Sequence, residues 1–95
     1  MISPNTATSI VTAVTGTTAT STLAMVAGGF YMLSSTTNCW IIQGSGTLTA
    51  AVNTSGNVYL PAGQVLVLNG VAGTSFAVIE DSAGGHISAC RLFNY

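Results

Sequence analysis

The sequence predicts an all-β protein, an antiparallel β-sandwich of jelly-roll type, and three observations support this. Charged residues make up 3% of the 95 residues, against roughly 25% in an average domain, so the side chains that build exposed helix faces are nearly missing. The β-branched residues Val, Ile and Thr occur 9, 6 and 14 times, which favours strands. Short apolar runs are separated by turn residues at about 8–12-residue intervals, a spacing typical of sandwiches and small barrels.

The N-terminal third is one long β-prone segment, residues 6–26, broken near Gly16. Two strands, or one strand followed by an arm, fit it equally well. Thr alternates with Ala and Ser at positions 18–22, which predicts a strand with one solvated, hydroxyl-lined face. Residues 1–5 are expected to form an N-terminal arm that hangs outside the fold or wraps a neighbour, and residues 6–95 a single β-sandwich domain.

Seven shorter runs follow, and each is bounded by turn residues such as Gly, Asn, Pro or Ser. Their β-branched and aromatic composition predicts strands. The runs are 30–33 (FYML), 39–42 (CWII), 47–52 (TLTAAV), 58–60 (VYL), 64–68 (QVLVL), 75–79 (SFAVI) and 86–93 (HISACRLF).

Three of these strands are apolar on both faces. A lone sandwich has one interior, and a chain of this length buries only about 60–65% of its surface. We therefore expect a second subunit or a larger body to cover the other face. Low net charge, −1 here, also favours association, because self-repulsion is weak. The predicted interface residues are Phe30, Met32, Trp40, Ile42, Leu66, Leu68 and Arg91.

Arg91 is the only Lys or Arg in the chain. If it is buried it needs a carboxylate or several carbonyl groups. The only candidate carboxylates are Glu80 and Asp81, in the same chain or in the next one. A plain exposed arginine is the alternative.

The composition argues against several classes of partner. One arginine cannot neutralise a run of phosphates, so no nucleic-acid partner is expected. No basic cluster exists to bind an anionic membrane surface. The longest apolar run, Leu23–Leu33, is about half of the roughly 20 residues that a transmembrane helix needs.

No catalytic residue, metal ligand or cofactor site is predicted. Asp81 and His86 flank the DSAGG turn, but no activated nucleophile accompanies them, so they are interpreted as turn residues. Glu80 and Asp81 as a paired acid/base site have little further support. The cysteines have no C-x-x-C spacing and the single histidine has no partner. Cys39 and Cys90 are expected to be buried thiols, with a disulfide as the alternative if their strands are neighbours.

Trp40, Tyr59 and Tyr95 are candidates for a sugar-stacking platform. Packing in the core or at an interface is the preferred interpretation, because these aromatics are few and lie between Ile and Leu.

Three blocks, YMLSSTTNCWIIQGSG (31–46), YLPAGQVLVLN (59–69) and FAVIEDSAGGHISACRL (76–92), occur in that order. They resemble a family of short virion structural proteins of tailed bacteriophages. Members of that family have an aromatic strand, a T-T-[DN]-C-[WY] motif, an L-P-A-G turn, and A-V-I followed by D-S-A-x-G. This chain departs from the pattern at Met32 and at 70–75 (GVAGTS), where the family often carries charge.

The resemblance implies a β-sandwich that decorates or cements a capsid. We therefore expect a non-enzymatic protein that binds the outer head surface as a symmetric homo-oligomer, with a trimer favoured, and stabilises contacts between subunits of the major capsid protein. It would be located in the virion and assembled in the bacterial cytoplasm. A tail or neck protein, and a receptor- or glycan-binding module, are the alternatives.

Overall fold

The computed structural model describes the backbone of residues 2–94 and the side chains of residues 9–92. These residues form eight strands and no helix. The strands are β1 (Ile2–Val14), β2 (Ala19–Thr20), β3 (Phe30–Ser35), β4 (Cys39–Gly44), β5 (Val58–Leu60), β6 (Val65–Asn69), β7 (Ser75–Glu80) and β8 (Gly85–Asn94).

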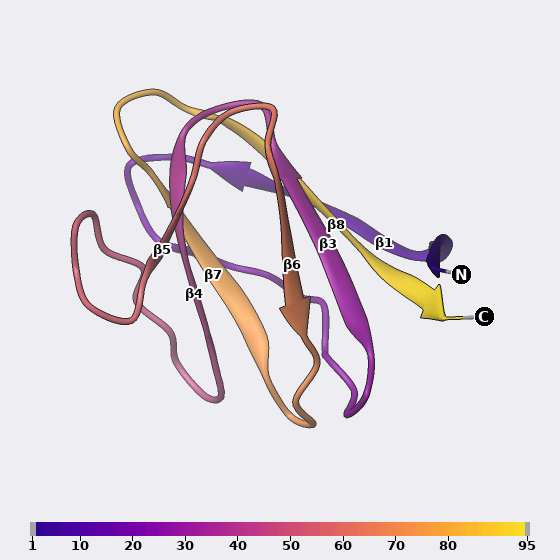
Figure 1. Cartoon of the computed structure of the whole chain (residues 1–95). Coiled ribbons are helices and arrows are strands. Elements are labelled where there is room, and N and C mark those ends of the chain that lie inside the picture. The colour runs from indigo at the N-terminus through magenta and orange to yellow at the C-terminus, as the bar shows by residue number, and fades with distance from the viewer. Residues whose placement is uncertain (1, 95) are drawn as a thin grey trace.

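The strands form two antiparallel sheets packed as a sandwich (Figure 1). Sheet A has the strand order β1-β8-β3-β6, and sheet B has the order β2-β7-β4-β5. Apart from the step from β4 to β5, every connection crosses from one sheet to the other. This winding is that of a jelly roll. The predicted fold class, an antiparallel jelly-roll sandwich, is therefore confirmed.

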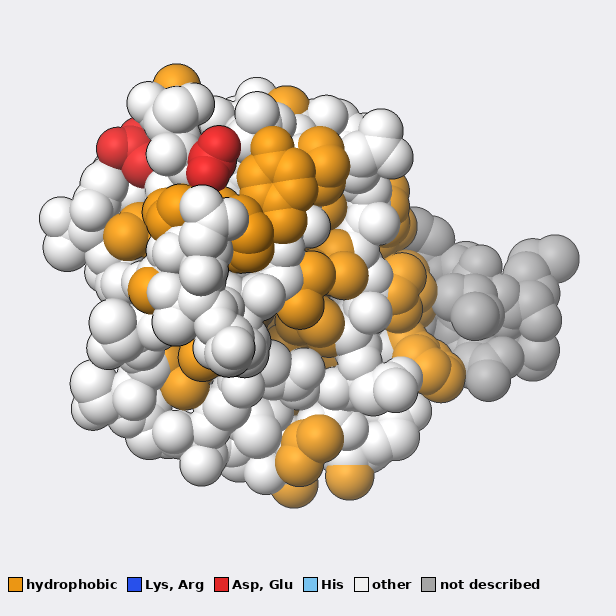
Figure 2. All heavy atoms as spheres, turned by 60° about the vertical axis from the view of Figure 1, so that its left-hand side comes forward, with side chains coloured by type: hydrophobic (Ala, Val, Ile, Leu, Met, Phe, Trp, Pro, Cys, Tyr) orange, Lys and Arg blue, Asp and Glu red, His pale blue; other side chains and the backbone are white. Residues whose placement is uncertain are grey.

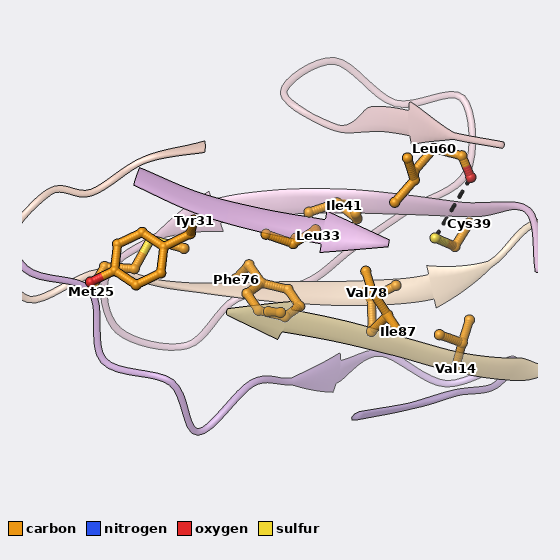
Figure 3. Close-up of a cluster of buried hydrophobic side chains, with 11 residues drawn as sticks. Val14, Met25, Tyr31, Leu33, Cys39, Ile41, Leu60, Phe76, Val78 and Ile87 are labelled. Carbon is orange, nitrogen blue, oxygen red and sulfur yellow. Dashed lines mark hydrogen bonds between the residues drawn. The ribbon is translucent and has the colours of Figure 1, made fainter. Parts of the chain in front are cut away.

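The core lies between the sheets and follows from alternation along the strands. In β3, Tyr31 and Leu33 are 1% and 0% exposed, whereas their neighbours in the strand are only half-buried. Phe76 and Val78 of β7 are fully buried on the facing sheet. Figure 3 shows these side chains converging from both sheets. The cluster also contains Val14, Met25, Cys39, Ile41, Leu60, Ile87 and Ala89.

Six of the seven short runs form strands, β3 to β8, with ends within two residues of the predicted ones. The predicted strand at 47–52 is wrong, because residues 45–57 join β4 to β5 without strand structure. This connection packs against the sandwich. The Thr18 hydroxyl donates to the Ala50 carbonyl at 3.0 Å, and Ala50 is 2% exposed. An alternating, β-branched composition is compatible with a hydrogen-bonded strand and also with an extended loop that packs on a sheet. Composition alone therefore did not distinguish the two structures.

The N-terminal segment divides between the sheets: β1 is an edge of sheet A and the short β2 an edge of sheet B. Met1, in the predicted arm, lies outside the described residues. The backbone of residues 2–5 pairs with residues 91–94 of β8, beyond an irregularity between Asn5 and Ser9. These ends run side by side away from the rest of the sandwich (Figure 1). Residues 2–5 are thus the end of a two-stranded ribbon.

Candidate functional site

The outward side of sheet A carries an apolar surface that we call the A face. Phe30 and Met32 lie on it, pointing away from buried Tyr31 and Leu33, and both are half-buried. In the antiparallel register Met32 is opposite Cys90 on one side and Val67 on the other. The A face is defined by Val11, Phe30, Met32, Val65, Val67, Cys90 and Leu92.

The A face is exposed and free of formal charge. Val11, Val65 and Val67 are 69%, 58% and 52% exposed. Among the described side chains that point outward from sheet A, none is Asp, Glu, Lys or Arg. The single histidine of the chain, His86, also lies on this side, at the start of β8. These valines lie at the two edges of sheet A, on β1 and β6, and half-buried apolar side chains of β8 and β3 lie between them. Exposed apolar side chains on one face of a sheet are typical of an interaction surface.

The structure places Leu66 and Leu68 differently from the interface prediction. Leu66 pairs with Leu33, and Leu68 pairs with Tyr31, so both leucines share the inward side of sheet A with those core residues. They are partly buried and pack against the core. The outward residues of β6 are the valines at 65 and 67. When a strand is apolar on both sides, its period identifies two faces but not which one is inside.

The outward side of sheet B carries Trp40 and Ile42. The ring centroids of Trp40 and Tyr59, which pair across β4 and β5, are 5.1 Å apart with a tilt of 47°. Ile42 is half-buried beside Ala77, which is fully buried although it points outward. Gly56 of the β4–β5 connection lies over Ile42, since a Cβ there would be 3.9 Å from Ile42 Cδ1. The connection therefore covers part of sheet B, while Tyr59 is exposed and Trp40 is half-buried.

Asp81 is fixed beside this aromatic pair. The Trp40 indole N–H donates to Asp81 Oδ1 at 2.9 Å, and the Asp81 backbone N–H donates to the Asn38 carbonyl at 3.0 Å. Asp81 is exposed and Tyr59 is 41% exposed. Figure 2 shows the red carboxylates next to orange apolar side chains. We call Trp40, Tyr59 and Asp81 the aromatic–acid patch. The sequence analysis named all three residues but contained no signal for the indole–carboxylate bond.

Arg91 lies at the other end of the sandwich. It is half-buried and pairs with Tyr31 at the start of β3. His86, close to the turn that holds Asp81, is five positions earlier in β8, which corresponds to about 17 Å along the strand. Among the described residues no hydrogen bond or ion pair involves the Arg91 side chain. The structure therefore does not bring Arg91 together with Glu80 or Asp81 of its own chain.

The two cysteines are free thiols. Cys39, on β4 of sheet B, points into the core, and Cys90, on β8 of sheet A, lies on the A face. The Cys39 thiol donates to the Leu60 carbonyl at a sulfur–oxygen distance of 3.8 Å (Figure 3). Burial raises the pKa of Cys39, and a hydrogen bond with Ser35 partly opposes this shift. The thiol therefore holds its proton more firmly than an ordinary thiol does.

The DSAGG turn is held by side-chain hydrogen bonds from Thr37 and Trp40, which are distant in the sequence. The Thr37 hydroxyl donates to the Ala83 carbonyl at 2.7 Å, and Asp81 is engaged by Trp40 as described. Among the described residues no pocket is present, and no group of three or more His, Cys, Asp or Glu side chains could hold a metal ion. Within residues 2–94 no helix is long and apolar enough to cross a membrane.

Comparisons with family models, with curated proteins and with solved structures found no match to this chain.

Proposed function

We propose that this chain is a non-enzymatic capsid decoration protein. It associates with copies of itself, and its A face is buried against another protein subunit. The observation that carries the proposal is the exposed, charge-free A face on a jelly-roll sandwich. Apolar area removed from water contributes about 25 cal/mol per Å² before the entropic cost of association. A protein that adds contact free energy to a shell needs such faces and needs no catalytic group.

The area of the A face determines how much of a protein–protein interface it can form. Four strands at about 4.8 Å spacing and six residues at about 3.3 Å rise make a face of roughly 400 Å². A standard interface uses about 800 Å² of each partner. The A face thus supplies about half of such a contact, and a stable oligomer needs a second surface. Symmetric repetition then lets several weak contacts to a shell act together.

The setting on a bacteriophage head, with the major capsid protein as partner and a trimer as the favoured oligomer, rests on the resemblance of the three sequence blocks. A tail or neck position draws on the same surface chemistry. Detection of the chain by mass spectrometry in purified virions, followed by its localisation on the head or the tail by labelling, tests this part. Its absence from purified particles contradicts the virion proposal.

Self-association is tested by light scattering on the purified protein. Val67→Asp places a charge in the A face and is expected to shift an oligomer to monomer without unfolding it. Val71→Asp is the matched control: Val71 is 56% exposed, close to the 52% of Val67, but lies in the turn after β6. A monomeric native protein, or equal effects of both substitutions, contradicts the proposal.

A glycan-binding module is the second candidate, because Trp40 and Tyr59 form an aromatic pair beside a carboxylate. Aromatic faces stack on sugar rings and carboxylates accept hydroxyl hydrogen bonds. Quenching of the single tryptophan by oligosaccharides, and hits on a glycan array, favour this candidate. Absence of both weakens it.

A further inference from the structure

All formal side-chain charge in this chain resides in three residues, Arg91, Glu80 and Asp81. Charge complementarity between the side chains of two copies must therefore be made from them. The carboxylates lie at the β7–β8 turn and Arg91 lies near the other end of β8. The molecule thus has an acidic end and a basic end, with an uncharged A face between them along sheet A.

The basic end presents an arginine whose side chain has no partner among the described residues. Arg91 is half-buried, its side chain makes no hydrogen bond with any described residue, and none of its side-chain nitrogens is both buried and unpaired. Its guanidinium nitrogens therefore reach the surface. A Cβ at Gly29 would lie 3.3 Å from Arg91 Nε, so the guanidinium rests on bare backbone beside Tyr31. A partly desolvated guanidinium of this kind gains most from a carboxylate supplied from outside.

The acidic end presents a carboxylate that is already oriented. Asp81 Oδ1 accepts the Trp40 indole hydrogen bond, and no described contact uses Oδ2. Asp81 is exposed, so its second carboxylate oxygen is accessible to a donor from another molecule. Arg, Trp and Tyr are the residues most enriched where interface energy is concentrated. Glu80 is less suitable, because its Oε1 and Oε2 lie 2.8 and 3.5 Å from Cβ positions at Gly16 and Gly84, among the turns of its own chain.

We infer that Arg91 of one copy bonds with Asp81 of a neighbouring copy, so that the aromatic–acid patch of one subunit receives the basic end of the next. This rests on the proposed self-association, and it identifies the second surface that the A face requires. The free Oδ2 accepts a guanidinium N–H while the indole keeps Oδ1. Such a contact between unlike residues is made reciprocally in a two-fold dimer and head to tail in a closed ring, so both assemblies satisfy it.

The test is a charge swap read by analytical ultracentrifugation. Arg91→Glu and Asp81→Arg are each expected to raise the dissociation constant of the oligomer about 100-fold, the typical effect of breaking a paired interfacial charge. The double variant with both substitutions restores an Arg–Glu pair across the interface and is expected to recover most of the affinity. Glu80→Gln is the matched control and should leave the dissociation constant unchanged.

The outcomes separate this inference from the proposed function. If the native protein is monomeric, both the proposed self-association and the inferred Arg91–Asp81 contact are contradicted. If the native protein is an oligomer and Arg91→Glu leaves it intact, or if the double variant is no better than the single ones, the Arg91–Asp81 contact is overturned while self-association stands. Circular dichroism of each variant excludes unfolding as the cause. Should Arg91→Glu not fold, Arg91→Gln paired with Asp81→Asn is measured instead, and each is then expected to weaken the oligomer without an additive effect in the double variant.

Discussion

Tyr31 joins two parts of the molecule through one hydroxyl group. Its ring is in the core at 1% exposure, and its hydroxyl accepts the Val26 backbone N–H at 2.9 Å. Tyr31 belongs to a run that is apolar on both faces, and the prediction of Phe30 and Met32 as interface residues placed Tyr31 on the opposite face. The bond to a backbone N–H five residues earlier was not predictable, because it depends on how residues 21–29 return over the open end of the sandwich.

Tyr31→Phe removes that acceptor and keeps the ring. A part-buried N–H is then left without its partner, so we expect the free energy of unfolding to fall by about 1–3 kcal/mol in urea denaturation. Tyr59→Phe is the matched control, since Tyr59 is 41% exposed, and it should change stability by less than about 0.5 kcal/mol. Equal losses in the two variants would show that the hydroxyl of Tyr31 does not stabilise this turn.

At the scale of elements, the sequence predicted which segments are strands better than which of their sides face inward. Strands β3 to β8 follow from short β-branched and aromatic runs between turn residues. In β6 both sides are apolar, and the register with Leu33 and Tyr31 decides that Leu66 and Leu68 point inward. The segment 45–57 covers sheet B instead of joining it. Such choices depend on contacts between distant segments, which a local pattern does not contain.

The β6–β7 turn meets the turn before β3 at Gly70, and this close approach gives a second prediction. The Gly70 N–H donates to the Gly29 carbonyl at 2.7 Å, and a Cβ at Gly70 would overlap the Val26 carbonyl oxygen and lie 2.8 Å from the Tyr31 ring. Backbone atoms cannot move aside as the end of a flexible side chain can. We therefore expect Gly70→Ala to lower the free energy of unfolding by at least about 3 kcal/mol.

The control for Gly70→Ala is Gly46→Ala. Gly46 has a φ of +71° and open space around its Cβ position, so alanine there meets only the left-handed backbone penalty of about 1–2 kcal/mol. Urea denaturation of both variants compares the two costs. A Gly70→Ala protein as stable as Gly46→Ala would mean that the two turns do not approach each other this closely.

At the scale of the whole molecule, few groups change charge when pH changes. The chain has two carboxylates, one histidine and one arginine, and His86 is exposed. Stability depends on pH only where the folded and unfolded states bind different numbers of protons. The free energy of unfolding should therefore vary by less than about 1 kcal/mol between pH 5 and pH 8.

The alkaline side differs, and Cys39 is the reason. Burial raises its pKa in the folded state above that of the unfolded chain. Its contribution to stability is therefore fully present below the pKa of an ordinary thiol, about 8.5, and is lost as pH rises through the folded pKa, because the unfolded state releases its proton first.

Urea denaturation from pH 5 to pH 10 should give a flat profile that falls above about pH 8.5. Cys39→Ala should remove that fall, whatever it costs in core packing, while Cys90→Ala should keep it. A steep loss between pH 7 and pH 5, or a fall that survives Cys39→Ala, would place the titrating group elsewhere in the molecule.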